Sequence, residues 1–474
     1  MSNPPAGDDP VVRLAAPDEL AKVFSASVGL ELLGEAHSDA DVMAAAERVI
    51  DYSVHTTHPR FMNQNYAGAD PVAVVGDWLG AALNTTNATF EVAPVFTMIE
   101  RAVLQRLAEL IGYPAADGSA APGLFCAGGS LAGLMALQLA RDRFDPQISS
   151  RGMSGQQFAV FVSATAHYST AKNAAILGLG TDTVIEVATD AAGAMIAGSL
   201  AAAIGTSRAA GVSPLAVVAT AGTTVTAAFD PIDAIADICD AEQLWLHVDG
   251  CYGGSALFSP SERHRLAGAE RSDSMSWNFH KMMGMTQQCS ALVVREASEL
   301  EMCFATGADY IFQADKEHGE LDAGDRTIMC GRRVDVLKLW LAWKSAGDAG
   351  FAARIDHAVE MANHARERIV AGDGEFVMVT PGDFTNVCFV WVPPDLRPLD
   401  LAGLAVPAHE RLHALAPAIK ARMQREGTAL VGYQPVHGIN AFRIIVMNPA
   451  VTRADIDAVL GLIASYGHAL GSRP

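Results

Sequence analysis

The chain has 474 residues, of which half are hydrophobic and 18% are charged. This composition excludes a globally disordered chain and predicts a large packed core in one large and one smaller domain. The formal net charge of −20 argues against a broad cationic surface for nucleic acid, so any phosphate group must be bound locally.

The N-terminal region and the apolar stretches indicate a cytoplasmic protein. The first ten residues contain neither a basic segment nor an apolar core, so they are not typical of a secretory signal. The most apolar long stretch, 196–218, is interrupted by Arg208, Gly211 and Pro214 and is a poor membrane span. We therefore expect no membrane partner.

Neither cysteine nor histidine spacing predicts a metal site. Seven cysteines occur without a CxxC pair, which indicates reduced thiols rather than a disulfide framework or a zinc site. His55 and His58 could share a helical face, but Pro59 follows them and no third ligand is evident. We expect no bound metal.

Apolar spacing predicts helices at the N-terminal end and an alternating α/β pattern after it. Segments 18–54 and 94–111 have helical spacing, and the second is followed by Gly112. Helical segments then alternate with β-rich runs; the expected strands are 158–163, 183–187, 215–220, 244–249 and 290–295. This alternation predicts a mainly parallel sheet flanked by helices, with functional groups at the carboxyl ends of the strands.

The remaining patterns predict a smaller C-terminal α/β domain. The polar segment 305–327 is expected to form a loop over a site, and helical spacing resumes at 333–346. Strands are expected at 387–392 and 441–447. The resulting expectation is an N-terminal arm at 1–60, a large domain at 61–346 and a small domain at 347–474.

Asp249 and Lys281 are the two residues whose chemistry stands out. Asp249 ends an expected buried strand, where an ionised carboxylate needs a cationic or hydrogen-bonding partner; a turn cap is the alternative. Lys281 follows 32 residues later among aromatic, imidazole and thioether side chains; an ordinary solvated lysine is the alternative. An amine that bonds to an aldehyde and a carboxylate that pairs with a pyridine nitrogen are what pyridoxal 5'-phosphate (PLP) requires.

Two further features lie between the N-terminal segment and Asp249. Gly128, Gly129 and Ser130 precede an expected helix, and this arrangement suits an anion, although a simple turn and cap is more common. His167 follows the expected strand 158–163, where an imidazole can stack on a cofactor ring; a surface or core histidine is the alternative.

Taken in order, these residues and their neighbours resemble the group II PLP-dependent amino-acid decarboxylases, and most closely the branch of glutamate, cysteine-sulfinate and aspartate decarboxylases. The resemblance extends from about His55 to the C-terminus. The segments that carry it are 58–64 (HPRFMNQ), 91–96 (EVAPVF), 221–224 (AGTT), 228–231 (AFDP), 247–249 (HVD), 277–281 (WNFHK), 288–292 (QCSAL) and 330–335 (CGRRVD).

The resemblance implies fold type I, the aspartate-aminotransferase type, and a homodimer with its active sites at the subunit interface. It also implies that Lys281 bonds covalently to PLP, that Asp249 pairs with the pyridine nitrogen and that His167 stacks on the ring. The remaining implied roles are phosphate binding by Gly128, Gly129, Ser130 and His280, lining of the cofactor site by Thr224 and Asn278, and substrate binding by Gln64, Tyr66, Asn84 and Arg443.

Two departures from the family pattern bear on the chemistry. Gly250 and Cys251 stand where the family commonly has two alanines after the aspartate. His318 aligns with a loop tyrosine that protonates the carbanion in the nearest relatives, and a histidine can donate a proton near neutral pH.

The expected function is therefore α-decarboxylation of an L-amino acid with an acidic or modified acidic side chain. The products would be an amine and carbon dioxide. Two alternatives stay open: oxidative deamination that gives an aldehyde, and a catalytically silent member of the family.

Overall fold

The computed structural model describes residues 9–26, 28–32, 34, 36–114, 120–153, 155–313, 315–401 and 403–471. The chain divides into two compact units. The smaller unit combines Met1–Gly68, Glu360–Val379 and Thr385–Pro474, and the larger combines Ala69–Val359 and Thr380–Phe384. The three-part division at residues 60 and 346 stays a prediction; in the structure the N-terminal segment groups with the C-terminal one.

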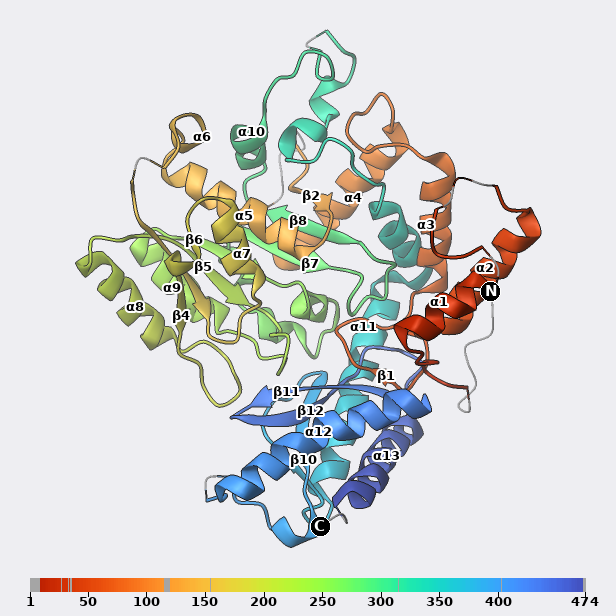
Figure 1. Ribbon diagram of the computed structural model, residues 1–474. Helices are drawn as coiled ribbons and strands as arrows, with labels where there is room; N and C mark the ends of the chain where they lie inside the picture. The colour runs from red at the N-terminus through yellow and green to blue at the C-terminus, as the bar shows by residue number, and fades with distance from the viewer. Residues whose placement is uncertain are drawn as a thin grey trace. The chain divides into compact units, whose positions relative to one another are not determined.

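A seven-stranded sheet forms the centre of the larger unit (Figure 1). Its strands follow the order β2 (Gly123–Cys126), β8 (Ser290–Val294), β7 (Ser274–Asn278), β6 (Trp245–Asp249), β5 (Ser213–Thr220), β3 (Phe158–Ser163) and β4 (Val184–Val187). The strands from β7 to β4 are parallel, whereas β8 runs antiparallel to both β7 and β2. The expectation of a mainly parallel sheet is confirmed, although β2 and β7 were not among the expected strands.

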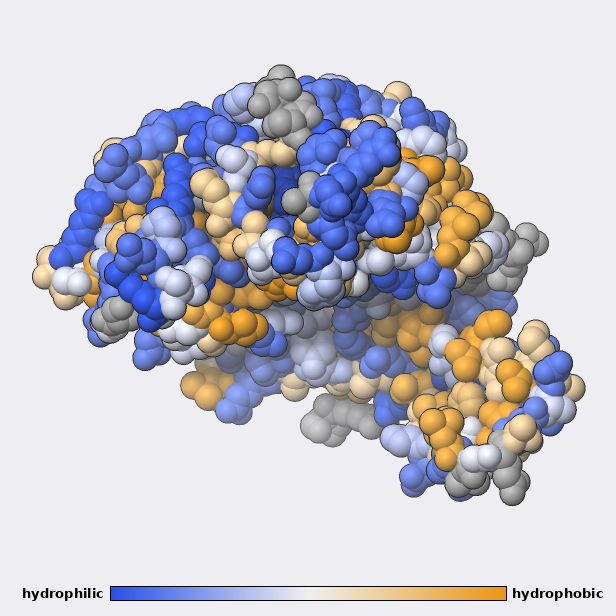
Figure 2. Space-filling model, turned by 90° about the horizontal axis from the view of Figure 1, so that it is seen from above, coloured by the Kyte–Doolittle hydropathy of each residue, from blue (hydrophilic) through white to orange (hydrophobic). Residues whose placement is uncertain are grey.

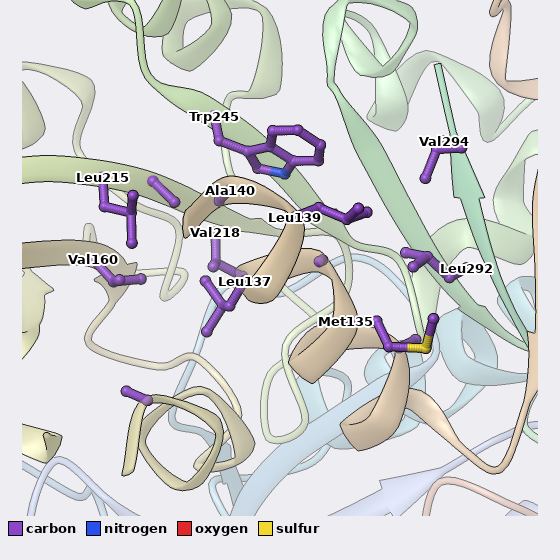
Figure 3. Packing of buried hydrophobic residues seen from close by; sticks show 14 of the residues in the cluster. Met135, Leu137, Leu139, Ala140, Val160, Leu215, Val218, Trp245, Leu292 and Val294 are labelled. Atoms are coloured by element: carbon purple, nitrogen blue, oxygen red, sulfur yellow. The ribbon is translucent and has the colours of Figure 1, made fainter. Parts of the chain in front are cut away.

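Helices cover this sheet because their apolar positions recur at helical spacing. The helices of the larger unit are α3 (Pro71–Leu83), α4 (Pro94–Ile111), α5 (Gly129–Phe144), α6 (Ile148–Arg151), α7 (Ser169–Ile176), α8 (Ala197–Ala209), α9 (Ile232–Glu242) and α10 (Ser298–Phe304). On α5, Met135 and Leu139 are buried at i and i+4 and pack with sheet residues such as Val218 and Leu292 (Figure 3). This packing fixes the start of α5 at one edge of the sheet.

A five-stranded sheet belongs to the smaller unit. Its strands follow the order β1 (Phe61–Met62), β11 (Leu430–Val436), β12 (Ile439–Ile445), β10 (Asn386–Trp391) and β9 (Phe376–Met378). Only β1 and β11 pair in parallel among these strands of the described chain. The helices of this unit are α1 (Pro17–Ser25), α2 (Asp39–Tyr52), α12 (Val406–Glu426) and α13 (Arg453–Gly471).

The remaining elements are one long helix and several 3-10 turns. Helix α11 (Val336–Val370) contains a non-helical residue, Gly347, with φ 64°. The 3-10 helices are η1 (Thr181–Thr183), η2 (Gly253–Phe258), η3 (Arg263–Leu266), η4 (Ala269–Arg271), η5 (Gly319–Leu321), η6 (Gly324–Arg326) and η7 (Pro394–Leu396). Among the described residues, no helix combines the length and apolarity needed to cross a bilayer.

Candidate active site

A cavity of about 300 Å³ lies at the carboxyl ends of the parallel strands in the larger unit. Three neighbouring strands end at residues that line it, namely Thr220 of β5, Asp249 of β6 and Asn278 of β7. Nine of the residues singled out in the sequence line this cavity: Gly128, Gly129, Ser130, His167, Thr224, Asp249, Asn278, His280 and Lys281. The sheet thus brings together side chains that are widely separated along the chain.

Asp249 presents an ionised carboxylate to the cavity. Its Oδ1 accepts hydrogen bonds from the Cys251 backbone N–H at 3.1 Å and from the Ser276 hydroxyl at 3.3 Å. Burial raises the pKa of Asp249, but the positive charge of Lys281 and the hydrogen bonds from Cys251 outweigh burial and hold the pKa below its usual value. A carboxylate in this state can pair with a protonated ring nitrogen.

Lys281 lies in the connection 279–289 between β7 and β8. The Phe279 N–H donates to the Cys289 carbonyl at 2.9 Å, and the Lys281 N–H donates to the Asn278 carbonyl at 3.2 Å. Within the described part of the chain, the Lys281 ammonium makes no hydrogen bond or ion pair with a protein group. The amine is therefore available for a cofactor.

Two cavity-lining histidines are held in the neutral form. Burial lowers the pKa of His280 to about 4, and its Nδ1 lies 3.1 Å from both the backbone nitrogen and the carbonyl oxygen of Cys289, which hold the ring in place. Burial also lowers the pKa of His167, whose Nδ1 lies 2.8 Å from the Ser169 hydroxyl. The ring of His167 therefore keeps a fixed orientation.

The start of α5 forms a cradle with free N–H groups and little space. The first N–H groups of a helix have no intrahelical partner and favour anions. Gly128 has φ 95°, a conformation that favours glycine. A Cβ on Gly129 would lie 2.2 Å from the Cys251 sulfur and 2.9 Å from the Asn278 amide. Glycine is therefore required at both positions.

Two buried polar atoms of the cavity have no hydrogen-bond partner among the described residues. They are Thr220 Oγ1 and Asn278 Oδ1. A buried polar atom without a partner is costly, so polar groups of a bound ligand would stabilise this arrangement. Together with the amine, the carboxylate and the anion cradle, these atoms fit PLP.

Two candidates of the larger unit lie outside this cavity. Asn84 ends α3 with φ 45° and lines a separate cavity with Asp77 and Lys338. His318 has φ 63° and a side chain that is 51% exposed, and its ring packs edge-on against Phe90 at a centroid distance of 5.0 Å. The structure does not bring either residue to Lys281 within the single chain.

The other candidates belong to the smaller unit, where they lie near an unpredicted lysine. Arg443 donates to the Asn63 carbonyl at 3.2 Å, and Lys420 donates to the Asn63 side-chain oxygen at 2.8 Å. Burial lowers the pKa of Lys420, and the charge of Arg443 lowers it further. Gln64 forms a β-bridge with Tyr66. Arg443 and Lys420 thus both bind Asn63, the residue before Gln64.

Sequence reasoning also missed several residues of the cavity. Thr220 could have been found, because it ends an expected strand. Gln287 and Gln288 line the cavity because the antiparallel strand β8 begins at this edge of the sheet. No pattern in the sequence indicated that direction.

Comparison with known proteins agrees with this geometry. A model described as the pyridoxal-dependent decarboxylase conserved domain matches residues 27–392. The chain belongs to the pyridoxal-dependent decarboxylase family. PLP is its cofactor, and the resemblance inferred from the sequence motifs is confirmed.

Relatives in this family match nearly the whole chain. The decarboxylase is 44% identical to human cysteine sulfinic acid decarboxylase over 459 residues, which cover 96% of this chain and 90% of that protein. It is 41% identical to the bovine acidic amino acid decarboxylase GADL1, with 95% of this chain and 85% of that protein covered. The crystal structure of mouse CSAD superposes with a TM-score of 0.91 at 42% identity, covering 98% of this chain and 94% of that chain. The fold is therefore that of a fold type I decarboxylase.

Proposed function

We propose that this PLP-dependent decarboxylase acts on an acidic L-amino acid and releases carbon dioxide and the corresponding amine. The observation that carries the chemistry is the arrangement of Lys281 and Asp249 in one cavity at the ends of parallel strands. The names of the relatives, cysteine sulfinic acid decarboxylase and acidic amino acid decarboxylase, support the substrate class.

Bound PLP supplies an aldehyde for attachment and a ring that accepts electrons from the breaking bond. We assign the Lys281 amine to the covalent attachment and the Asp249 carboxylate to retaining a proton on the ring nitrogen. His167, in a fixed neutral state, is assigned to the face of the ring. Phosphate binding is assigned to Gly128, Gly129, Ser130 and His280, and lining of the ring to Thr224 and Asn278.

Recognition of an acidic side chain requires a local positive charge, because the whole chain has a net charge of −20. Arg443 and Lys420 supply two cations anchored on Asn63. We assign Arg443 to the substrate carboxylate, with Lys420 beside it. Gln64, Tyr66 and Asn84 are assigned to the walls around the substrate side chain.

The proton that replaces carbon dioxide at the α carbon is assigned to His318. Because His318 and Asn84 lie outside the Lys281 cavity in the single chain, we propose that the protein acts as a homodimer with active sites at the interface. Large apolar side chains support such an interface: Trp78 on α3 is 60% exposed and Val95 on α4 is 64% exposed. In Figure 2, separate hydrophobic patches lie among mostly hydrophilic residues on the face that is shown.

We also propose a cytoplasmic location. All seven cysteines are unpaired, and five of them are buried. Free thiols persist in a reducing compartment.

Turnover of an amino-acid panel with PLP tests this function. We expect carbon dioxide and amine from aspartate, glutamate or cysteine sulfinate, and far less from leucine or tryptophan, with products identified by mass. The control is Lys281→Ala, which should lose turnover by at least about a thousandfold. Unchanged turnover in Lys281→Ala would reject the assigned chemistry.

The half-exposed position of His318 favours one second candidate, because an α carbon left without a fixed proton donor is open to oxygen. An oxygen electrode and aldehyde detection in the same panel separate the two outcomes. Stoichiometric amine without oxygen uptake rules out oxidative deamination as the main reaction.

A further inference from the structure

Asp249 is bound by two donors that come from different directions. Its partner in the register of the neighbouring parallel strand is Ser276, so the two side chains occupy equivalent positions on β6 and β7. The Ser276 hydroxyl and the Cys251 backbone N–H both donate to the same oxygen, Oδ1, at 3.3 and 3.1 Å. This leaves Oδ2 of the carboxylate for a ligand.

The thiol of Cys251 continues this hydrogen-bonded chain. Its sulfur lies 3.3 Å from the Ser276 hydroxyl oxygen, and both side chains are buried, at 7% and 1% exposure. Burial raises the pKa of Cys251 well above its usual value, so the group stays a protonated thiol. When the Ser276 oxygen accepts a hydrogen bond from the S–H group, the Ser276 hydroxyl can use its own hydrogen to donate a hydrogen bond to Asp249.

The thiol also contacts the opposite wall of the cavity. Cys251 packs so closely on Gly129 that a Cβ there would lie 2.2 Å from the sulfur. The sulfur therefore lies between the start of α5 and the Ser276 hydroxyl. The distance of 3.3 Å to the Ser276 oxygen favours the orientation in which S–H points to Ser276.

We propose that Cys251 and Ser276 are positioning residues that form a directed relay, from S–H to O–H to the Asp249 carboxylate, and thereby set how tightly the enzyme holds PLP. This inference rests on the assignment of Asp249 to the ring nitrogen. The relay acts by keeping Oδ1 occupied and the carboxylate in one orientation. The Cys251 backbone N–H donates to Asp249 directly, whatever the side chain. The relay concerns the thiol alone, and it requires that the thiol's contribution to PLP binding disappear when Ser276 is removed.

The test measures the dissociation constant of PLP for the apoenzyme by absorbance titration, together with the pH midpoint of the absorbance of bound cofactor. Ser276→Ala removes a hydrogen bond to a charged group and should raise the dissociation constant about tenfold. Cys251→Ala should raise it about threefold, because a thiol is a weak donor. Cys251→Ser keeps a donor and should stay within about twofold of the wild type.

The double variant separates a relay from simple packing. Cys251→Ala combined with Ser276→Ala should match Ser276→Ala alone, because members of one network are not additive. The matched control is Cys239→Ala, a buried cysteine on α9 that does not line the cavity and should leave the dissociation constant unchanged. The relay would be rejected if the two substitutions raised the dissociation constant of PLP multiplicatively in the double variant. It would also be rejected if Cys251→Ser bound PLP clearly more weakly than the wild type.

Asp249→Asn distinguishes failure of the relay from failure of the proposed function. If Asp249→Asn binds PLP as the wild type does, the assignment of Asp249 itself is wrong. If Asp249→Asn weakens binding while the Ser276 and Cys251 variants do not, only the relay is overturned. Urea unfolding of each apoenzyme identifies any variant that fails to fold, and the pH midpoint then decides, since loss of packing alone would not move it.

Discussion

Glu100 of α4 and Arg332 form a buried ion pair along the edge of β2 that does not pair with β8. Glu100 accepts from the Phe125 backbone N–H at 2.7 Å, and Arg332 donates to the Phe125 carbonyl at 3.1 Å. The side chain of Arg332 is 2% exposed and that of Glu100 is 4% exposed. The pair therefore fixes the strand that leads directly into the glycine cradle of the cavity.

Glu100→Ala should destabilise the protein by about 3–5 kcal/mol, because it leaves the Arg332 charge buried without its partner. Urea unfolding measures the change. The matched control is Arg333→Ala, the adjacent arginine, whose side chain is 65% exposed and pairs with Asp77. That variant should lose less than about 1 kcal/mol. Equal losses in the two variants would contradict the assignment of the buried pair.

Gly129→Ala should weaken PLP binding by at least about tenfold, since a Cβ would overlap the Cys251 sulfur and the Asn278 amide. Titration of the apoenzyme measures this. Gly198→Ala is the control: this helical glycine of α8 has no atom near its Cβ position, so stability should rise by about 0.5–1 kcal/mol without a change in binding. Normal PLP binding in Gly129→Ala would mean that the cradle can widen.

Stability should fall in mild acid because of His247 on β6. Burial lowers its pKa from 6.5 to about 4, so between these values the unfolded chain binds a proton that the folded chain does not. The stabilisation is complete above about pH 6.5 and is lost as the pH falls toward 4. His247 alone should lower the free energy of unfolding by about 2 kcal/mol between pH 7.5 and pH 5.

His247→Gln should remove that share of the pH dependence, measured as urea unfolding free energies at both pH values. The exposed His264 offers the control, because His264→Gln should leave the pH dependence as it is. If the free energy of unfolding of His247→Gln fell between pH 7.5 and pH 5 as much as that of the wild type, another group would be responsible for the loss of stability in acid.

Mixed dimers test whether His318 serves the cavity of another copy. Chains with Lys281→Ala and chains with His318→Phe should each be inactive in decarboxylation. If the two residues act across the interface, co-expressed chains form one intact site per mixed dimer and regain roughly a quarter of the wild-type activity, by the counting of closed twofold assemblies. No recovery in isolated mixed dimers would place His318 and Lys281 in the same chain.

The parts of the fold that the sequence predicted are those specified by local patterns. Helix α4 spans the expected residues 94–111, and β3 spans the expected residues 158–163, because apolar periodicity and flanking turns are local. The pairing of β1 with β11 joins Phe61 to Leu430, and no local pattern contains such a partner. The grouping of the N-terminal segment with the C-terminal one follows from this distant pairing.

The candidate site likewise contains residues that local sequence patterns predicted and residues whose roles depend on distant contacts. Asp249 could be placed because it ends a buried strand, and Lys281 because of its apolar neighbours. Ser276 could not, since its importance comes from the register between β6 and β7. Lys420 was missed because it lies within α12 and its partner, Asn63, is far away in the chain.

The reversed direction of β8 has a mechanical consequence for Lys281. Because β8 returns antiparallel, both ends of the segment 279–289, which carries Lys281, are held in the sheet, where β7 and β8 pair from Ser274–Val294 to Asn278–Ser290. The pairing of the two strands offsets the entropy cost of closing this loop. Lys281 follows the end of β7 by only three residues, so the sheet keeps its backbone near the strand that ends at Asp249.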